Sequence, residues 1–129
     1  MSLLNITNEL VVANVSEAIE FYKSNFGFIL EESYGVPVSW AKIKKENMVL
    51  MFEDYSEICK EINNYPKKVA SSNLIMFEYS DLLEVKELYS LLKKNKVPFF
   101  SDYTETDYGK VEFGVYDLDK NMILISAMI

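Results

Sequence analysis

Residues 10–28, LVVANVSEAIEFYKSNFGF, contain the pattern that decides the fold. The apolar run Leu10–Ala13 predicts a short strand. Asn14 or Ser16 then predicts the start of a helix, because both side chains cap helix N-termini. Apolar residues follow at helical spacing, and Gly27 predicts the end of the helix, since glycine adopts the left-handed backbone at low cost. This stretch therefore predicts a strand that leads directly into a helix.

The same pattern returns in the second half of the chain. The stretch FEYSDL at 77–82 aligns without a gap against LVVANV at 10–15, and each leads into a helix in the same register. An internal repeat with a period of about 60 residues indicates a fold built from two copies of one unit.

Further strands complete each half, as alternating apolar residues between turn signals indicate. They are predicted at 28–30, 38–43 and 48–52, and at 97–100, 111–116 and 122–125, with a four-residue connection at 44–47, a short helix at 57–62 and a linker at 63–68. The fold class is therefore predicted as α+β, with two tandem βαβββ modules. The modules are expected at about 5–62 and 72–129, within a single domain of 1–129.

The composition excludes several kinds of chemistry. The chain contains no histidine, so no histidine base, nucleophile or metal ligand takes part in its function. All 13 positive charges are lysines, and the net charge is −7. Arginine is the preferred reader of phosphate and guanine, so neither nucleic acid nor an anionic membrane surface is expected as a partner. A neutral or cationic small molecule is a better match for the negative net charge. The alternative explanation is that the negative charge only keeps the protein soluble.

Cysteine usage and hydropathy indicate the compartment. Cys59 is the single cysteine, so no disulfide can form within the chain, and a packing role is favoured over a nucleophilic one. No segment reaches the length of an apolar membrane span, and the start of the chain lacks the pattern of a secretory signal. We therefore expect a cytoplasmic protein.

Three stretches resemble the vicinal-oxygen-chelate superfamily, which includes glyoxalase I, extradiol dioxygenases and bleomycin-resistance proteins. They are the strand, cap and helix at 10–28 with their Phe-Tyr and Gly-Phe pairs, the hairpin at 40–51, and the closing segment DLDKNMILI at 117–125. The resemblance covers essentially the whole chain and implies that the two βαβββ modules form cup-shaped mixed sheets. Leu118 and Lys120 depart from the proline and glycine that the family usually has in its last turn.

The metal enzymes of this superfamily take their ligands from four strands, commonly His or Gln, Glu, His and Glu. Counting from the two helix caps and along the hairpin and last strand, the resemblance places these positions at Thr7, Leu50, Leu74 and Leu124. Three are aliphatic, and divalent metals need imidazole, carboxylate or amide oxygen. A shift of one or two residues would bring in Glu9 or Glu53, but never a histidine or glutamine. No cofactor is therefore expected, and the metal-free, bleomycin-resistance-like branch is the closer resemblance.

In the absence of a metal site, the alternation of side chains along each strand predicts which residues line a ligand cavity. The expected ligand-binding residues are apolar or aromatic side chains edged by carboxylates: Trp40, Met48, Phe52, Met76, Glu78, Glu112, Glu9 and Tyr116. Aromatic faces beside carboxylates suit an organic cation. The aromatics and methionines would serve equally well as core or as a dimer interface, and the glutamates as solvated strand positions.

The function predicted is metal-independent binding of a small molecule, cationic or aromatic, as in the bacterial proteins of the superfamily that confer antibiotic resistance by sequestering a drug. The resemblance also implies a homodimer. The alternative is a lyase or dioxygenase-type enzyme of the same superfamily, in which a glutamate acts as the base. A degenerate module serving as an interaction or sensor domain is a third reading.

Overall fold

Both ends of helix α1 (Val15–Phe26) lie where the sequence predicts them. The side chain of Asn14 caps the helix by accepting a hydrogen bond from the backbone N–H of Glu17 at 3.0 Å. Gly27 ends it in the left-handed conformation, with φ of 76°, and donates its N–H to the carbonyl of Lys23. Of the two cap residues that the sequence left open, Asn14 is therefore the one used.

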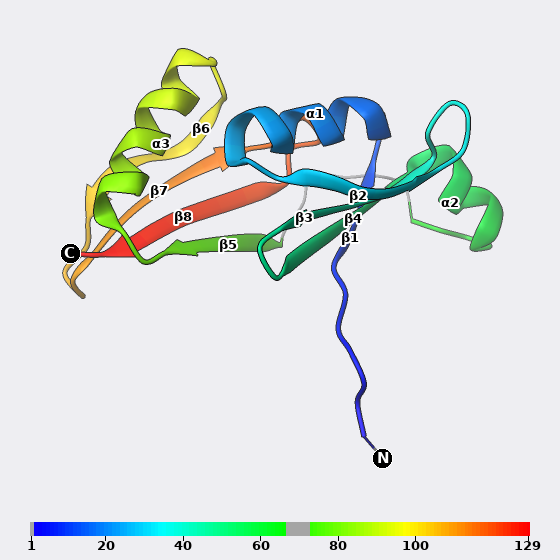
Figure 1. Cartoon of the computed structure of the whole chain (residues 1–129), viewed down its shortest axis with the longest axis horizontal. Helices are drawn as coiled ribbons and strands as arrows, with labels where there is room; N and C mark the ends of the chain where they lie inside the picture. The colour runs from blue at the N-terminus through cyan, green and yellow to red at the C-terminus, as the bar shows by residue number, and fades with distance from the viewer. Residues whose placement is uncertain (1, 67–72) are drawn as a thin grey trace. The chain divides into compact units, whose positions relative to one another are not determined.

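The computed structural model describes residues 2–66 and 73–129, which fall into two compact units, Met1–Lys67 and Lys68–Ile129. Each unit contains one four-stranded mixed sheet (Figure 1). The prediction of two βαβββ modules in an α+β fold is confirmed. That the two modules make one domain remains a prediction.

Sheet A belongs to the first unit and has the strand order β1-β4-β3-β2. Its strands are β1 (Glu9–Val12), β2 (Ile29–Tyr34), β3 (Trp40–Lys45) and β4 (Met48–Asp54). β1 pairs with β4 in parallel, and the other neighbours are antiparallel. A short helix, α2 (Tyr55–Glu61), follows β4 directly.

Sheet B repeats this arrangement in the second unit, with the strand order β5-β8-β7-β6. Its elements are β5 (Leu74–Tyr79), α3 (Leu82–Lys94), β6 (Phe99–Glu105), β7 (Lys110–Tyr116) and β8 (Met122–Met128). Asp81, which stands opposite Asn14 in the alignment of the two halves, caps α3 by accepting a hydrogen bond from the N–H of Leu83 at 2.8 Å.

Several predicted boundaries need correction. The hairpin of β3 and β4 closes with the two-residue turn Glu46–Asn47, because β3 continues to Lys45, two residues further than its apolar residues indicate. The second helix begins at Tyr55, two residues early, because Asp54 caps it. Part of the predicted linker at 63–68 lies outside the described residues.

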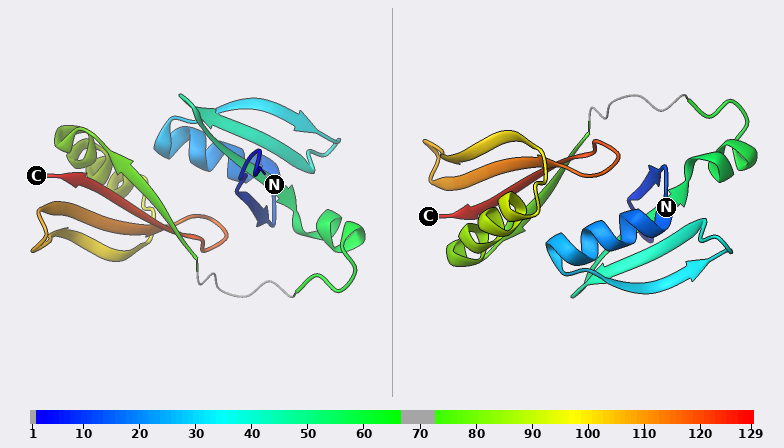
Figure 2. Two further views of the ribbon diagram at one scale, coloured as in Figure 1. Left: turned by 90° about the horizontal axis from the view of Figure 1, so that it is seen from below. Right: turned by 90° about the horizontal axis from the view of Figure 1, so that it is seen from above.

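Helices α1 and α3 each pack on one face of their own sheet, and the two cores form there (Figure 2). In the first unit, the rings of Tyr22 on α1 and Phe52 on β4 lie 5.3 Å apart. In the second, the ring of Tyr89 on α3 lies 5.3 Å from that of Phe113 on β7. Burying apolar surface in this way supplies most of the stability of a small module.

Within the described part of the chain, no helix combines the length and apolar character needed to cross a membrane.

Candidate functional site

The face of each sheet that turns away from its helix holds most of the residues predicted to bind a ligand. We call it the distal face. In sheet A, Ala41 and Ile43 are buried toward α1, so the alternate residues Trp40 and Lys42 belong to the distal face. Strand pairing adds the residues in register with these two, which are Glu9, Met51 and Glu53.

Trp40 and Glu9 are joined across the distal face of sheet A. The indole Nε1 of Trp40 donates a hydrogen bond to Oε1 of Glu9 at 3.2 Å, although 31 residues separate them in sequence. The strand between them is β4. An aromatic face is thus held beside a carboxylate, which is the pair that the sequence predicts for a cationic ligand.

Phe52 and Met48 lie elsewhere, and the predicted orientation of β4 was wrong by one residue. Phe52 has no exposed surface, and its ring packs against Tyr22 in the core. Met48 has the same strand parity and lies at the start of β4 with 56% of its surface exposed. The error arises because a one-residue change in strand phase moves every side chain to the opposite face.

The same correction moves one of the four positions at which the resemblance places metal ligands. Leu50 is buried toward α1, and Met51 takes its place on the distal face, in register with Glu9. Leu74 and Leu124 do lie on the distal face of sheet B. Thr7 precedes β1 and is exposed.

Threonine, methionine and two leucines therefore stand where the resemblance calls for imidazole, amide and carboxylate donors, and these residues do not fit a divalent metal. Across residues 2–66 and 73–129, no group of three or more His, Cys, Asp or Glu side chains is arranged to hold a metal ion.

Glu53 is the buried acid of the distal face of sheet A, with only 7% of its surface exposed. Burial is the main cause that raises the pKa of its carboxyl group to about 7, and a hydrogen bond with Glu61 together with the charges of Glu9, Glu61 and Glu57 contributes to the same shift. Two carboxyl groups can form a hydrogen bond only when one of them carries a proton. The carboxyl group of Glu53 therefore keeps its proton to a higher pH than an ordinary glutamate does.

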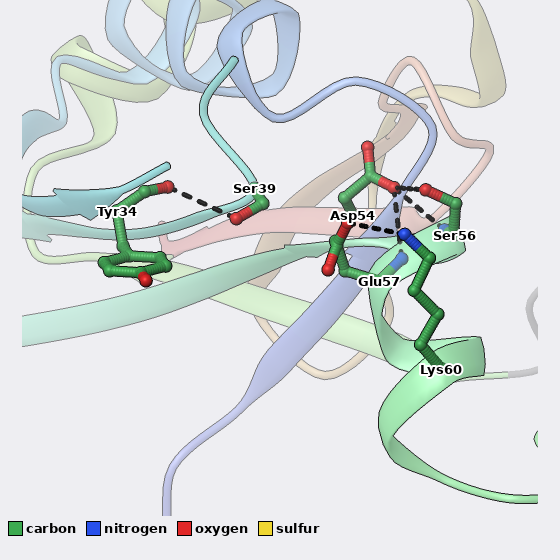
Figure 3. A network of polar contacts seen from close by, with 6 residues as sticks. All are labelled: Tyr34, Ser39, Asp54, Ser56, Glu57 and Lys60. Atoms are coloured by element: carbon green, nitrogen blue, oxygen red, sulfur yellow. Dashed lines mark hydrogen bonds and ion pairs between the residues drawn. The ribbon is translucent and has the colours of Figure 1, made fainter. Parts of the chain in front are cut away.

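The next residue, Asp54, has a pKa shifted in the opposite direction, which favours its ionised form. Its carboxylate accepts hydrogen bonds from the hydroxyl of Ser56 and from the backbone N–H groups of Ser56 and Glu57 (Figure 3). These bonds cap the N-terminus of α2. The bond from the Ser56 hydroxyl is the main cause that lowers the pKa of Asp54. Asp54 thus fixes the start of the helix whose last residue is Glu61.

The distal face of sheet B is organised in rows that run across its strands. Alternate residues of β5, β8 and β7 share this face, whereas those between them, such as Phe113 and Ile125, are buried toward α3. The three rows are Leu74–Met122–Tyr116, Met76–Leu124–Gly114 and Glu78–Ser126–Glu112. The predicted site residues Met76, Glu78, Glu112 and Tyr116 are therefore brought onto one surface.

Phe100 also belongs to this surface, and the sequence pattern did not predict it. Phe99 pairs with Val115 and Ser101 with Gly114, so β6 has an extra residue between them. That residue is Phe100, whose ring lies 5.4 Å from the ring of Tyr116. Two signals in the sequence could have indicated Phe100: the adjacent pair Phe99-Phe100 and the glycine within β7. The contact between Phe100 and Gly114 depends on a bulge, however, and the sequence does not specify where a bulge forms.

The fold and its two distal faces define a protein made of paired βαβββ modules, with no metal-binding side chains at the corresponding positions. The chain belongs to the Glyoxalase/Bleomycin resistance protein/Dioxygenase superfamily, whose family model matches residues 3–125. A comparison with curated proteins gave no match.

Solved structures share the fold over nearly the whole chain. A glyoxalase/bleomycin resistance protein/dioxygenase from Nocardioides has 19% identity and a TM-score of 0.76, over 100% of this chain and 86% of its own. The hypothetical protein SA1046 from S. aureus has 14% identity and a TM-score of 0.81, over 98% and 95%. A lactoylglutathione lyase from Agrobacterium tumefaciens has 18% identity and a TM-score of 0.76, over 96% and 92%. At these identities the similarity concerns the fold.

Proposed function

We propose that this chain is a metal-independent protein that binds a small molecule on the distal faces of its sheets. The distal face of sheet B carries the proposal. Leu74 and Met76 leave 46% and 50% of their surfaces exposed on a regular strand, where solvated positions are ordinarily polar. Contiguous exposed apolar surface in a soluble protein marks a binding site for a ligand or partner.

The ligand class follows from the charged groups that border these apolar side chains. Glu9 accepts the hydrogen bond of Trp40 on sheet A, and Glu78 and Glu112 lie in one row on sheet B. With a net charge of −7, the chain favours a cationic or aromatic compound over an anion. Sequestration of such a compound by a cytoplasmic homodimer, as in bacterial antibiotic resistance, is the role we propose.

A metal-free lyase or dioxygenase-type enzyme is the second candidate, and Glu53 is the observation that favours it. A carboxyl group whose pKa is raised to about 7 is suited to accept or donate a proton near neutral pH. Trp40 is in register with Glu53 on the neighbouring strand. The fold shared with a lactoylglutathione lyase is consistent with this second candidate.

A thermal-shift screen of the full chain against a broad panel of metabolites and antibiotics tests the proposal. A ligand at 100 times its Kd should stabilise the protein by about 2.7 kcal/mol. Trp40→Ala should weaken binding on sheet A. If no compound in the panel stabilises the protein, the binding function is wrong.

Elemental analysis of protein purified without chelator tests the metal-independent part of the proposal. Stoichiometric zinc, nickel or iron would contradict it. If the wild type converts a bound compound to product and Glu53→Gln does not, the second candidate, an enzyme, is favoured over a binding protein. Sedimentation equilibrium tests the homodimer, because a mass of one chain would exclude it.

A further inference from the structure

Phe100 is turned onto the distal face of sheet B by the bulge in β6. The preceding residue, Phe99, packs toward α3, with its ring 5.5 Å from Tyr89 and stacked on Phe113 at 5.6 Å. Phe99 therefore belongs to the core. Phe100 lies on the other side of the strand, against Gly114 of β7. The two neighbouring phenylalanines thus serve different purposes.

Gly114 is the residue that allows Phe100 to take this position. A Cβ atom added at Gly114 would lie 2.1 Å from Cζ of Phe100, 2.4 Å from Cε1 and 2.6 Å from Cε2. These similar distances place the added atom under the face of the ring rather than beyond its edge. The ring therefore lies flat on the backbone of β7, and its other face points away from the sheet.

Tyr116 completes an aromatic corner with Phe100. Their ring centroids are 5.4 Å apart and their planes are tilted by 58°. A flat ring that stacks on Phe100 would present its edge to Tyr116, which is a favourable geometry for aromatic groups. The corner is therefore shaped for a planar aromatic group.

The adjacent row on the same face is acidic. Glu78 and Glu112 lie on either side of Ser126, on strands β5, β7 and β8. Neighbouring strands are about 4.8 Å apart, so the backbones of the two glutamates are roughly 10 Å apart. Ser126 between them is buried, with 1% of its surface exposed, so an ammonium group would be held by the two carboxylates rather than by Ser126. The Tyr108 hydroxyl donates a hydrogen bond to Glu112 at 2.6 Å, which orients that carboxylate. Lys110 lies one row further from the aromatic corner.

The distance between the two features sets the length of the ligand. Gly114 and Glu112 are two residues apart on β7, which corresponds to about 7 Å along the strand. A ligand that stacks on Phe100 would therefore carry its positive charge about 7 Å from the centre of its ring.

We propose that the distal face of sheet B binds a small aromatic cation, with its ring in the corner of Phe100 and Tyr116 and its ammonium group between Glu78 and Glu112. This inference rests on the proposed binding function and adds to it the sheet, the orientation and the ligand class. Gly114 is a positioning residue in this site, because it acts through Phe100.

Three compounds that differ in one feature each test the inference by isothermal titration of the full chain. Tryptamine has an indole ring and an ammonium group on a two-carbon chain, indole-3-propionate has a similar ring with a carboxylate, and hexylamine has the ammonium group without a ring. Tryptamine should bind at least about fivefold more tightly than either of the others. Equal binding of the anion, or of hexylamine, would overturn the inference.

Variants of the aromatic corner test the geometry. Phe100→Leu should weaken tryptamine binding at least about fivefold while leaving hexylamine unchanged. Gly114→Ala should do the same by displacing the ring, and should have no additional effect in the Phe100→Leu background. Tyr103→Leu is the matched control, because Tyr103 lies on the same strand and packs against Tyr89 of α3.

The outcomes separate this inference from the proposed function. If the protein binds other small molecules, and neither Phe100→Leu nor Glu78→Gln changes any of their affinities, the site on sheet B is wrong and the proposed binding function stands. A broad screen without any ligand would overturn both. Circular dichroism of each variant establishes that it is folded, and Phe100→Leu provides the test should Gly114→Ala fail to fold.

Discussion

Trp40 on β3 donates a hydrogen bond to Glu9 on β1 across the intervening strand β4, with 3.2 Å between Nε1 and Oε1. This contact connects the first strand of the module to the hairpin and positions the indole ring on the distal face. A hydrogen bond to a charged acceptor is stronger than a neutral one, but solvent around this pair reduces its net contribution.

Trp40→Phe removes the donor and keeps an aromatic ring, so we expect the free energy of unfolding to fall by about 0.5–1 kcal/mol. Urea unfolding followed by circular dichroism measures this, since Trp40 is the single tryptophan and its fluorescence is lost. A double-mutant cycle with Glu9→Ala isolates the pair. A coupling energy of zero would show that the two side chains do not interact in solution.

Phe52 and Met48 should respond very differently to truncation, although the sequence pattern placed both in the site. Phe52 is fully buried against Tyr22, so Phe52→Ala should cost about 3–5 kcal/mol. Met48 is 56% exposed, and Met48→Ala should change stability by less than about 0.5 kcal/mol. Urea unfolding of both variants measures the difference. A small effect of Phe52→Ala would contradict its assignment to the core.

Glu53 should make the stability of the protein depend on pH. Its pKa is about 7 in the folded protein, whereas a glutamate without these contacts has an ordinary pKa of 4.5. Between these values the folded protein holds a proton that the unfolded chain has released. The free energy of unfolding should therefore fall as the pH rises through this window, by at most about 1.4 kcal/mol per pH unit for one proton.

Glu53→Gln should remove this slope, because the amide does not titrate. Urea unfolding from about pH 5 to about pH 8 measures it in the wild type and the variant. Glu87→Gln is the matched control, since Glu87 is an exposed glutamate on α3. Identical pH profiles for the wild type and Glu53→Gln would show that Glu53 is ionised throughout the window.

Asp54→Ala should weaken α2 by removing its N-terminal cap. The loss of a capping side chain costs about 1 kcal/mol, and Asp54→Asn should retain most of that stability because asparagine also caps helices. Hydrogen exchange of the amides of Ser56 and Glu57, which donate to Asp54, measures the effect locally. Unchanged protection in Asp54→Ala would mean that the cap contributes little.

The two ends of α1, the start of α3 and the two-module repeat were determined by the sequence alone. Asn14 and Asp81 cap their helices through hydrogen bonds that span two or three residues, and Gly27 ends α1 through its own backbone conformation. Such interactions depend on neighbours in the chain, so a local pattern specifies them. That Leu74 and Leu124 face away from α3 could be predicted in the same way, because the alternation of side chains along a strand is a local pattern.

Only the tertiary structure decided which residues meet on each distal face. Glu53 reaches Glu61 and Glu9 through strand pairing and the packing of α2, and Phe100 reaches Tyr116 through a bulge. The orientation of β4 was wrong for a related reason, since its residues 48–52 are apolar on both faces and give no alternation to follow. The register of a strand depends on its partners, and a change of one residue reverses its faces.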